Sequence, residues 1–392
     1  MLEEARNLQA ELVELRRYLH AHPELSFQEK ETARFVGYQL EKLGFKVKRG
    51  LAKTGLIADF KAQDGPLIAI RADMDALPLE EAAATSYRSC NKGVMHACGH
   101  DAHMSCALGA ATLLKQHASE YTGQVRMLMQ PSEEGPDEEG KSGAYRMIED
   151  DALAGVSAII GLHMDAALPA GKVSIVPGAV MAAVDPFVIT IKGRGGHAAF
   201  PENTVDAVVI GAQVIQAIQQ IVSRKISALD TAVISIGSFQ SSSTKDNIIS
   251  DEVILKGTIR TFSRDVRKII LEQLEQACAI SRNFGGDYRI VYAHGYPPTV
   301  NDPQVTQIMH QAAVSLIGEE NVVLLPPKLW SEDFSMYQEL TPGAFMFLGC
   351  EIAGDRRHHH MPEFDIDESG LYIGSAILAE TGKRLLEHLR NR

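Results

Sequence analysis

Apolar side chains along the first forty residues have the spacing of two amphipathic helices. Leucines occupy positions 8, 12, 15 and 19, at intervals of four, three and four residues, which places them on one helical face. We expect this helix to end before His22-Pro23. A second helix is predicted over residues 28–43, ending at Gly44, because glycine readily takes the positive φ found at helix ends.

Four short apolar runs, bounded by glycine, proline or polar residues, predict the strands of a buried sheet. They lie at residues 56–60, 67–71, 125–129 and 158–162. Helical stretches at 102–116 and 143–148 lie between them along the chain. Strands that alternate with helices predict an α/β layered domain with a largely buried sheet.

The pattern changes after residue 181. The elements predicted next are a strand at 187–192, a helix at 205–222, strands at 232–236 and 253–259, a helix at 266–281 and a strand at 288–292. This order predicts a small α+β unit of the split type. The sequence then resumes helix, strand and helix, and finishes with a long amphipathic helix over 370–389. We therefore expect one discontinuous domain of residues 1–181 and 295–392, interrupted by a domain of residues 182–294.

Composition and charge restrict the possible partners. The 392 residues include 50 acidic and 38 basic side chains, a formal charge of −12, which would repel phosphate backbones and anionic lipid heads. No run of about 18 apolar residues exists, so we expect no membrane-spanning helix. The N-terminal residues do not resemble a secretory signal, and the five cysteines are odd in number, so we expect reduced thiols and a cytoplasmic location.

The segment from His96 to His103 concentrates metal-ligand chemistry directly before a predicted helix. Cys98 and His100 are two residues apart, and extended backbone would point both side chains the same way, toward one ion. The same residues also fit a simple turn and helix start, with Asp101 as a carboxylate in the first turn. From this segment alone, both interpretations stay open.

Further candidate ligands follow other predicted strands. Glu133 and Glu134 come soon after the strand at 125–129. Adjacent carboxylates at a strand end can have different roles, one binding metal and the other holding a proton. His163 closes the strand at 158–162, and three histidines occupy 358–360. Each feature alone also fits a solvated loop or a capped histidine. Five of these side chains together have the chemistry that a pair of divalent ions needs: Cys98, His100, Glu134, His163 and His360.

Other polar side chains could support or complete such a site. The segment 71–78 places carboxylates after a buried strand, where an aspartate could hold a ligating histidine by its free N–H. The alternative is a plain turn. In the inserted domain, His197 lies in a glycine-rich loop, and Asn247 and Arg260 lie near strand ends, where they could bind an anion or remain at the surface.

Taken together, these segments resemble the M20 metallopeptidase superfamily, within it the amidohydrolase branch of aminoacylases, hippurate hydrolases and auxin-conjugate hydrolases. The resemblance runs nearly end to end. It rests on residues 16–26, 71–78, 93–101, 130–135, 161–163, 193–197, 246–249 and 331–334. It implies an α/β catalytic domain of the phosphorylase/hydrolase type, interrupted by a ferredoxin-like lid or dimerisation domain, and a homodimer or higher oligomer.

The resemblance also implies roles for the candidate residues. Cys98 would bridge two divalent ions, zinc, manganese, nickel or cobalt, with His100 and Glu134 on one side and His163 and His360 completing the set. Glu133 matches the general base, and Asp73 matches the carboxylate that orients the metal site. The substrate contacts would come from His197, reaching across a dimer, and from Asn247 and Arg260.

The implied reaction is hydrolysis of the amide bond of an N-acyl amino acid. Glu133 would take a proton from a metal-activated water and pass it to the departing amine, His197 or Asn247 would donate to the oxyanion, and Arg260 would hold the substrate carboxylate. A dipeptidase or carboxypeptidase-like activity at the same site is the main alternative. Two further alternatives are a non-catalytic metal-binding protein and a thiol hydrolase in which His96 or His100 activates Cys98.

The sequence departs from the branch around the site. The loop at 136–139 is acidic, Ser132 stands where alanine is common, Ser250 replaces a usual proline, and residues 164–167 differ from the aromatic or apolar residues expected after His163. None of these changes removes a candidate ligand or the base. They predict a different pocket shape and substrate preference.

Overall fold

The computed structural model describes residues 1–293, 295–355 and 357–392. The chain forms two compact units, the larger made of Met1–Val180, Val300–Pro326 and Asp333–Arg392 and the smaller of Met181–Thr299 and Pro327–Glu332. His294, where the sequence-based boundary falls, lies outside the described residues. Among the residues described, no helix has both the length and the apolar character needed to cross a membrane.

An eight-stranded mixed sheet forms the centre of the larger unit. Its order is β1 (Lys46–Leu51), β2 (Gly55–Lys61), β4 (Gln124–Gln130), β3 (Leu67–Asp73), β5 (Val156–Pro169), β16 (Gly343–Glu351), β6 (Val173–Ser174) and β15 (Val322–Val323). Neighbouring strands from β4 through β3 and β5 to β16 are parallel, and β1 and β2 pair antiparallel at one edge. The four predicted strands are therefore confirmed, and their apolar runs reflect burial on both faces of the sheet.

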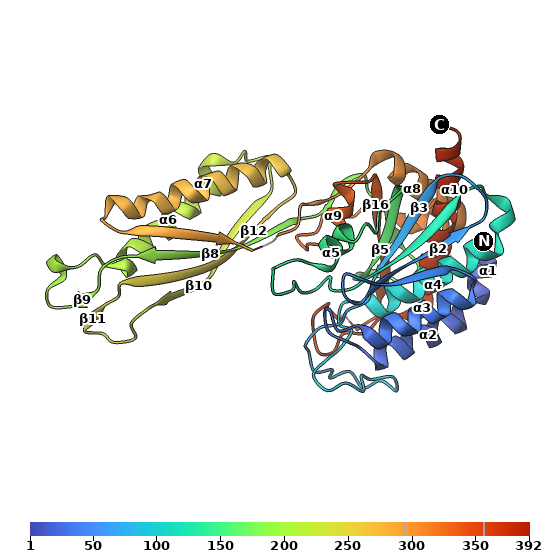
Figure 1. Cartoon of the computed structure of the whole chain (residues 1–392), viewed down its shortest axis with the longest axis horizontal. Helices are drawn as coiled ribbons and strands as arrows, with labels where there is room; N and C mark the ends of the chain where they lie inside the picture. Colours follow the sequence, from blue (N-terminus) through green and yellow to red (C-terminus); the bar gives the residue numbers. More distant parts are fainter. Residues whose placement is uncertain (294, 356) are drawn as a thin grey trace. The chain divides into compact units, whose positions relative to one another are not determined.

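Helices cover this sheet. They are α1 (Leu2–Asn7), α2 (Gln9–Ala21), α3 (Lys30–Lys42), α4 (His100–Gln116), α5 (Gly143–Glu149), α8 (Pro303–Ile317), α9 (Phe334–Gln338) and α10 (Leu371–Arg390). Helices α2, α3 and α4 lie side by side in Figure 1, and α4 packs on β3 and against α10. The helices predicted from leucine spacing and from residues 102–116 and 370–389 are confirmed.

The smaller unit has the split α+β order predicted from the sequence. Its elements are β8 (Ala183–Lys192), α6 (Ala207–Lys225), β10 (Ala232–Ser241), β12 (Glu252–Thr261), α7 (Arg264–Asn283) and β13 (Asp287–Tyr292). The four strands form an antiparallel sheet in the order β10-β12-β8-β13, the ferredoxin-like arrangement. Buried residues of the sheet and of both helices form a core separate from that of the larger unit.

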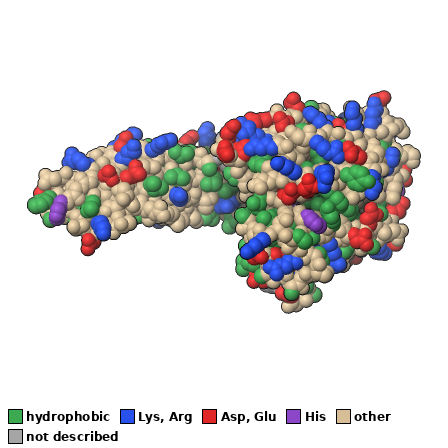
Figure 2. All heavy atoms as spheres, turned by 60° about the horizontal axis from the view of Figure 1, so that its bottom comes forward, with side chains coloured by type: hydrophobic (Ala, Val, Ile, Leu, Met, Phe, Trp, Pro, Cys, Tyr) green, Lys and Arg blue, Asp and Glu red, His purple; other side chains and the backbone are tan. Residues whose placement is uncertain are grey.

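Several short elements complete the chain. They are β7 (Gly178–Met181), β9 (Gly196–His197), β11 (Ile248–Ile249), β14 (Thr299–Asn301) and the 3-10 helices Ala118–Glu120, Pro201–Asn203, Glu319–Asn321 and Glu368–Gly370. On the face drawn in Figure 2, Lys and Arg side chains are interspersed with Asp and Glu side chains. This mixed surface accompanies the net negative charge of the sequence.

Candidate metal centre

The candidate ligands of the larger unit gather near the carboxyl ends of β3 and β4. Asp73 is the last residue of β3, and Glu133 and Glu134 follow β4. His163 lies level with Asp73 within β5, which continues to Pro169, so the prediction that His163 closes this strand is wrong. His100 is the first residue of α4, which packs on β3. Because β3, β4 and β5 run parallel, their carboxyl ends meet at one edge of the sheet, the usual ligand site of α/β folds.

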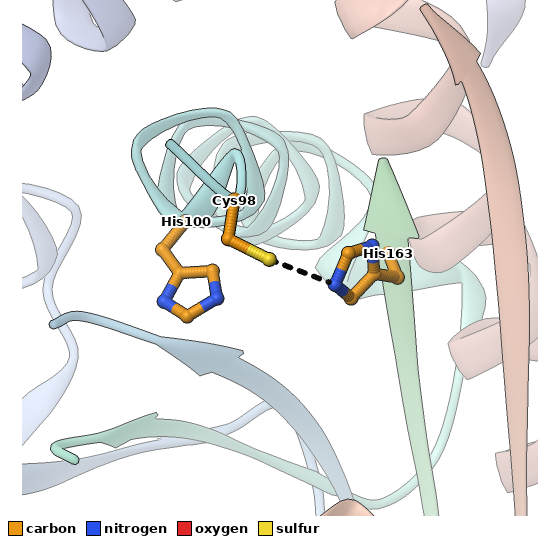
Figure 3. A group of neighbouring side chains, drawn as sticks. All are labelled: Cys98, His100 and His163. Carbon is orange, nitrogen blue, oxygen red and sulfur yellow. Dashed lines mark hydrogen bonds between the residues drawn. The ribbon is translucent and has the colours of Figure 1, made fainter. Parts of the chain in front are cut away.

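A glycine allows Cys98 and His100 to face the same space. Gly99 precedes α4 with φ of 95°, a left-handed conformation that residues with a side chain rarely adopt. A Cβ atom at this position would also lie 3.0 Å from the Met164 Cβ atom. Figure 3 shows Cys98, His100 and His163 pointing toward one another, with the Cys98 sulfur directed at the His163 ring.

The distances between ligand atoms match those around a shared ion. Cys98 Sγ lies 3.5 Å from His163 Nε2 and 3.4 Å from His360 Nε2. His360 Nε2 is 3.1 Å from Glu134 Oε1. Two tetrahedral ligands of a zinc ion, one sulfur and one nitrogen, are about 3.5 Å apart. Cys98 thus belongs to two potential ligand groups, one with His100 and His163 and the other with Glu134 and His360.

Hydrogen bonds orient the rings of two histidines so that each Nε2 atom lies near other candidate ligands. His163 Nδ1 donates to the main-chain oxygen of Met164 at 2.6 Å, and His100 Nδ1 donates to the main-chain oxygen of Asp75 at 2.9 Å. The Nε2 atom of His100 is buried and forms no hydrogen bond with any residue that the structure describes. A buried imidazole nitrogen without a partner is costly, so these residues fit a divalent transition metal.

Burial and neighbouring charges set the protonation of the metal-free site. Burial lowers the pKa of His163 well below its usual value, which keeps this imidazole neutral. Burial opposes protonation of His100 too, but Asp73 and Asp75 outweigh it and raise its pKa to about 10. Burial and then the charge of Glu134 raise the pKa of the Cys98 thiol. A cation must therefore displace protons from Cys98 and His100 when it binds.

The buried carboxylate of Asp73 contacts basic groups around the site. Its Oδ1 atom accepts from His103 Nδ1 at 2.7 Å, and its Oδ2 atom accepts from Arg71 Nη1 at 2.7 Å. His103 Nε2 accepts the main-chain N–H of Met164 at 2.9 Å, so both ring nitrogens of His103 are occupied. Asp73 Oδ2 lies 3.7 Å from His100 Nε2, whereas the main-chain oxygen of Asp75 accepts the Nδ1–H of His100.

Glu133 lies next to two candidate ligands. Its carboxylate, that of Glu134 and the ring of His100 bring ligand atoms within 4.8 Å of one another, and Glu133 is 8% exposed. The preceding Ser132 has φ of 52°, a left-handed conformation that costs about 1 kcal/mol or more for a residue with a side chain. The loop thus turns sharply to direct two consecutive carboxylates at the site.

The smaller unit brings two of its three candidate residues together. His197 lies on β9 and Asn247 immediately precedes β11, and these strands pair with each other. His197 Nδ1 accepts the main-chain N–H of Ala199 at 3.0 Å, which leaves an Nε2–H exposed. Arg260 is near the far end of β12, about 26 Å along the strand from its start. One nitrogen of its guanidinium, Nη1, is buried without a hydrogen-bond partner among the described residues.

The sequence indicates His103 as a possible ligand and Asp75 as a possible supporting carboxylate, but it does not predict the contact of Asp75 with His100 or of His103 with Asp73. The segment 71–78 was recognised as a source of supporting carboxylates, but the pattern does not say which carboxylate reaches a histidine. His103 has the spacing of a further ligand, and only its two hydrogen bonds reveal its supporting position.

The chain is similar to known proteins in both sequence and fold. The profile of peptidase family M20/M25/M40 matches residues 69–384. The chain is 40% identical to the N-acetyl-L-cysteine deacetylase of Bacillus subtilis over 388 residues, 97% of this chain and 89% of that protein. It is 36% identical to the IAA-amino acid hydrolase ILR1-like 4 of Arabidopsis thaliana, over 97% of this chain and 86% of that protein.

A solved structure agrees with this match. The crystal structure of the Bacillus subtilis YXEP protein, described as a dinuclear metal binding peptidase from the M20 family, superposes with a TM-score of 0.84 at 35% identity. The comparison covers 97% of this chain and 99% of that one. The expected resemblance and the α/β fold class are thereby confirmed. The chain is a hydrolase of peptidase family M20/M25/M40.

Proposed function

We propose that the protein hydrolyses the amide bond of N-acyl amino acids with two divalent ions, zinc, manganese, nickel or cobalt. One observation carries the proposal: Cys98 belongs to two ligand groups at once, and Glu133 lies beside them. The ligands would be Cys98, His100, Glu134, His163 and His360. The names of the two similar enzymes, a deacetylase of an N-acyl amino acid and a hydrolase of amino acid conjugates, support the substrate class.

The bound ions would supply Lewis acidity and lower the pKa of a water molecule. Glu133 takes the proton of the attacking water and later delivers it to the departing amine. The low exposure of Glu133 excludes bulk water from this transfer and strengthens its electrostatic interactions. Asp73 remains ionised beside Arg71, because the cations around it hold its pKa well below the usual range despite burial. It therefore supplies a fixed negative charge behind His100.

The substrate would be held by residues of the smaller unit. An unpartnered guanidinium nitrogen makes Arg260 suitable for binding the substrate carboxylate. His197, with its exposed Nε2–H, and Asn247 can donate to the oxyanion. Strand β11, which pairs with β9, ends just before β12 begins, so about 26 Å of β12 lies between this pair and Arg260. This length exceeds that of an N-acyl amino acid and favours the contribution of His197 and Asn247 to the site of a second subunit in a homodimer.

Mixed dimers test this arrangement. An H197A subunit and an R260A subunit, each inactive alone, should regain activity when mixed and allowed to exchange subunits, because half of the mixed sites then have both residues intact. Activity that stays absent after exchange has been demonstrated would contradict the assignment of His197 to a second subunit.

The thiol mechanism is disfavoured by the surroundings of Cys98. Its sulfur is buried near Glu134 and Glu133, and these surroundings raise the pKa of the thiol, whereas nucleophilic cysteines have a lowered pKa. A dipeptidase or carboxypeptidase-like activity would use the same ligands and base. It differs from the proposal only in the acyl side of the cleaved amide, which is an aminoacyl or peptidyl group in place of a simple acyl group.

A substrate panel distinguishes these activities. The metal-reconstituted protein is assayed for release of free amino acid from N-acetyl and N-benzoyl amino acids and from dipeptides, with and without chelator. Chelator-sensitive release that favours N-acyl amino acids is the expected result. Preference for dipeptides would favour the peptidase, and release that persists after complete metal removal would favour a thiol mechanism.

A further inference from the structure

Asp75 holds the main chain on which Glu133 and Glu134 are carried. Its side chain is fully buried two residues beyond the end of β3. Its Oδ1 atom accepts the main-chain N–H of Glu133 at 3.0 Å, and its Oδ2 atom accepts the main-chain N–H of Glu134 at 3.0 Å. One carboxylate thus fixes two consecutive residues, the candidate base and a candidate ligand.

The same residue orients a second ligand. The main-chain oxygen of Asp75 accepts from His100 Nδ1 at 2.9 Å, and Asp75 Oδ1 lies 3.4 Å from that nitrogen. These contacts turn His100 Nε2 toward the ion site, where it has no hydrogen-bond partner among the described residues. Ser26 Oγ donates to Asp75 Oδ2 at 2.7 Å and braces the carboxylate from the side of the N-terminal helices.

These bonds are strong enough to hold a strained loop. The carboxylate of Asp75 accepts three hydrogen bonds, from the Ser26 hydroxyl and from the main-chain amides of Glu133 and Glu134. Hydrogen bonds to a charged acceptor are about twice as strong as neutral ones. They offset the left-handed backbone of Ser132, directly before the two held amides.

We propose that Asp75 is a positioning residue that fixes Glu133, Glu134 and His100 in their ion-binding arrangement before any ion arrives. The inference rests on the proposed function, because it takes these three residues as the base and two of the ligands. None of the hydrogen bonds that Asp75 forms with the described residues uses an atom that would bind an ion, so the arrangement does not require the ions. Asp75 itself contacts neither substrate nor ion.

The test compares Asp75→Asn with a matched variant, Asp101→Asn. Asp101 is also a fully buried carboxylate and adjoins His100 in sequence, but its carboxylate accepts from Arg16 and His20, away from the glutamate loop. An asparagine at position 75 keeps one acceptor and places an NH2 group against the other amide, so one of the two loop bonds is lost. Both variants remove one buried negative charge.

Cobalt binding to the metal-free proteins is the first readout, followed through the thiolate-to-cobalt absorption of Cys98. Asp75→Asn should bind cobalt about tenfold or more weakly, the usual effect of losing a group that orients a ligand, and should lower kcat with little change in KM. Asp101→Asn should lose thermal stability but keep the wild-type cobalt affinity and spectrum. Wild-type cobalt affinity in folded Asp75→Asn would overturn the inference.

A measurement on the wild-type protein keeps the inference testable if Asp75→Asn fails to fold. In chelator-treated protein, the amides of Glu133 and Glu134 should exchange hydrogen about a hundredfold or more slowly than in an unstructured peptide. Exchange at the unstructured rate would overturn the proposal. A wild-type protein that shows the cobalt and exchange results but cleaves no N-acyl amino acid or dipeptide would contradict the proposed function and leave the positioning role intact.

Discussion

Glu29 offers a quantitative prediction, because its buried carboxyl is held close to the glutamate loop. Its Oε1 atom accepts the main-chain N–H groups of Phe27 and Ser132, both at 2.9 Å, and its Oε2 atom accepts from the hydroxyl of Thr54. Burial and then the negative charge of Asp75 raise the pKa of Glu29 from 4.5 to about 7. The folded protein therefore retains this proton to a higher pH than the unfolded chain.

The sign of the effect follows from this difference. Below pH 4.5 the carboxyl is protonated in both states, and its contribution to stability is fully present. Between pH 4.5 and about 7 the unfolded chain binds fewer protons than the folded protein, so the free energy of unfolding falls as pH rises. Between pH 5 and pH 8 the loss from this one group is about 2.5 kcal/mol.

Glu29→Gln removes the titration and keeps the hydrogen bonds. The amide oxygen can accept from Phe27 and Ser132, and the amide NH2 can donate to the hydroxyl of Thr54. Urea unfolding of chelator-treated wild type and variant at pH 5 and pH 8 measures the change. The stability of the variant relative to wild type should rise by about 2.5 kcal/mol between the two pH values. Parallel pH profiles would refute a raised pKa at Glu29.

Three further changes have defined outcomes. Gly99→Ala should destabilise the protein by about 1 to 3 kcal/mol and weaken cobalt binding, because φ of 95° and the contact with Met164 both disfavour a side chain. Wild-type stability in urea unfolding and wild-type affinity in cobalt titration would contradict this prediction. Arg16→Met should cost about 3 to 5 kcal/mol in urea unfolding, since it leaves three carboxylates without their fully buried cation, and a loss below about 1 kcal/mol would show that they tolerate its absence. Zinc added to metal-free protein at pH 7 in a weak buffer should release protons, from Cys98 and His100 above all, and binding without proton release would contradict their raised pKa values.

Most of the secondary structure followed from hydrophobic spacing, because the sheet of the larger unit is buried on both faces. The strands β3 and β4 are 7 residues each, and apolar runs this short are typical of buried strands, whereas helices are longer. Strand β1 was missed, because four of its six residues are exposed and its sequence, KVKRGL, has no apolar run. An exposed edge strand leaves little hydrophobic pattern in a sequence.

The candidate ligands were also predictable, because the metal-ligand chemistry of cysteine, histidine and glutamate is visible in the residue types. The position of Asp75 was not, because the groups that it binds are mainly main-chain amides, which every residue except proline supplies. The separation of Arg260 from His197 required the strand register, since only the pairing of β9 with β11 places His197 at the opposite end of β12.

The central claim is that Glu133 is the base of a two-ion amide hydrolase. The most direct test compares wild type with Glu133→Gln for both metal content and release of amino acid from the best N-acyl substrate. Glu133 is assigned no ligand role, so the account predicts two ions per chain in both proteins and loss of turnover by about a hundredfold or more in the variant alone. Turnover near the wild-type rate in a variant that holds two ions would contradict it.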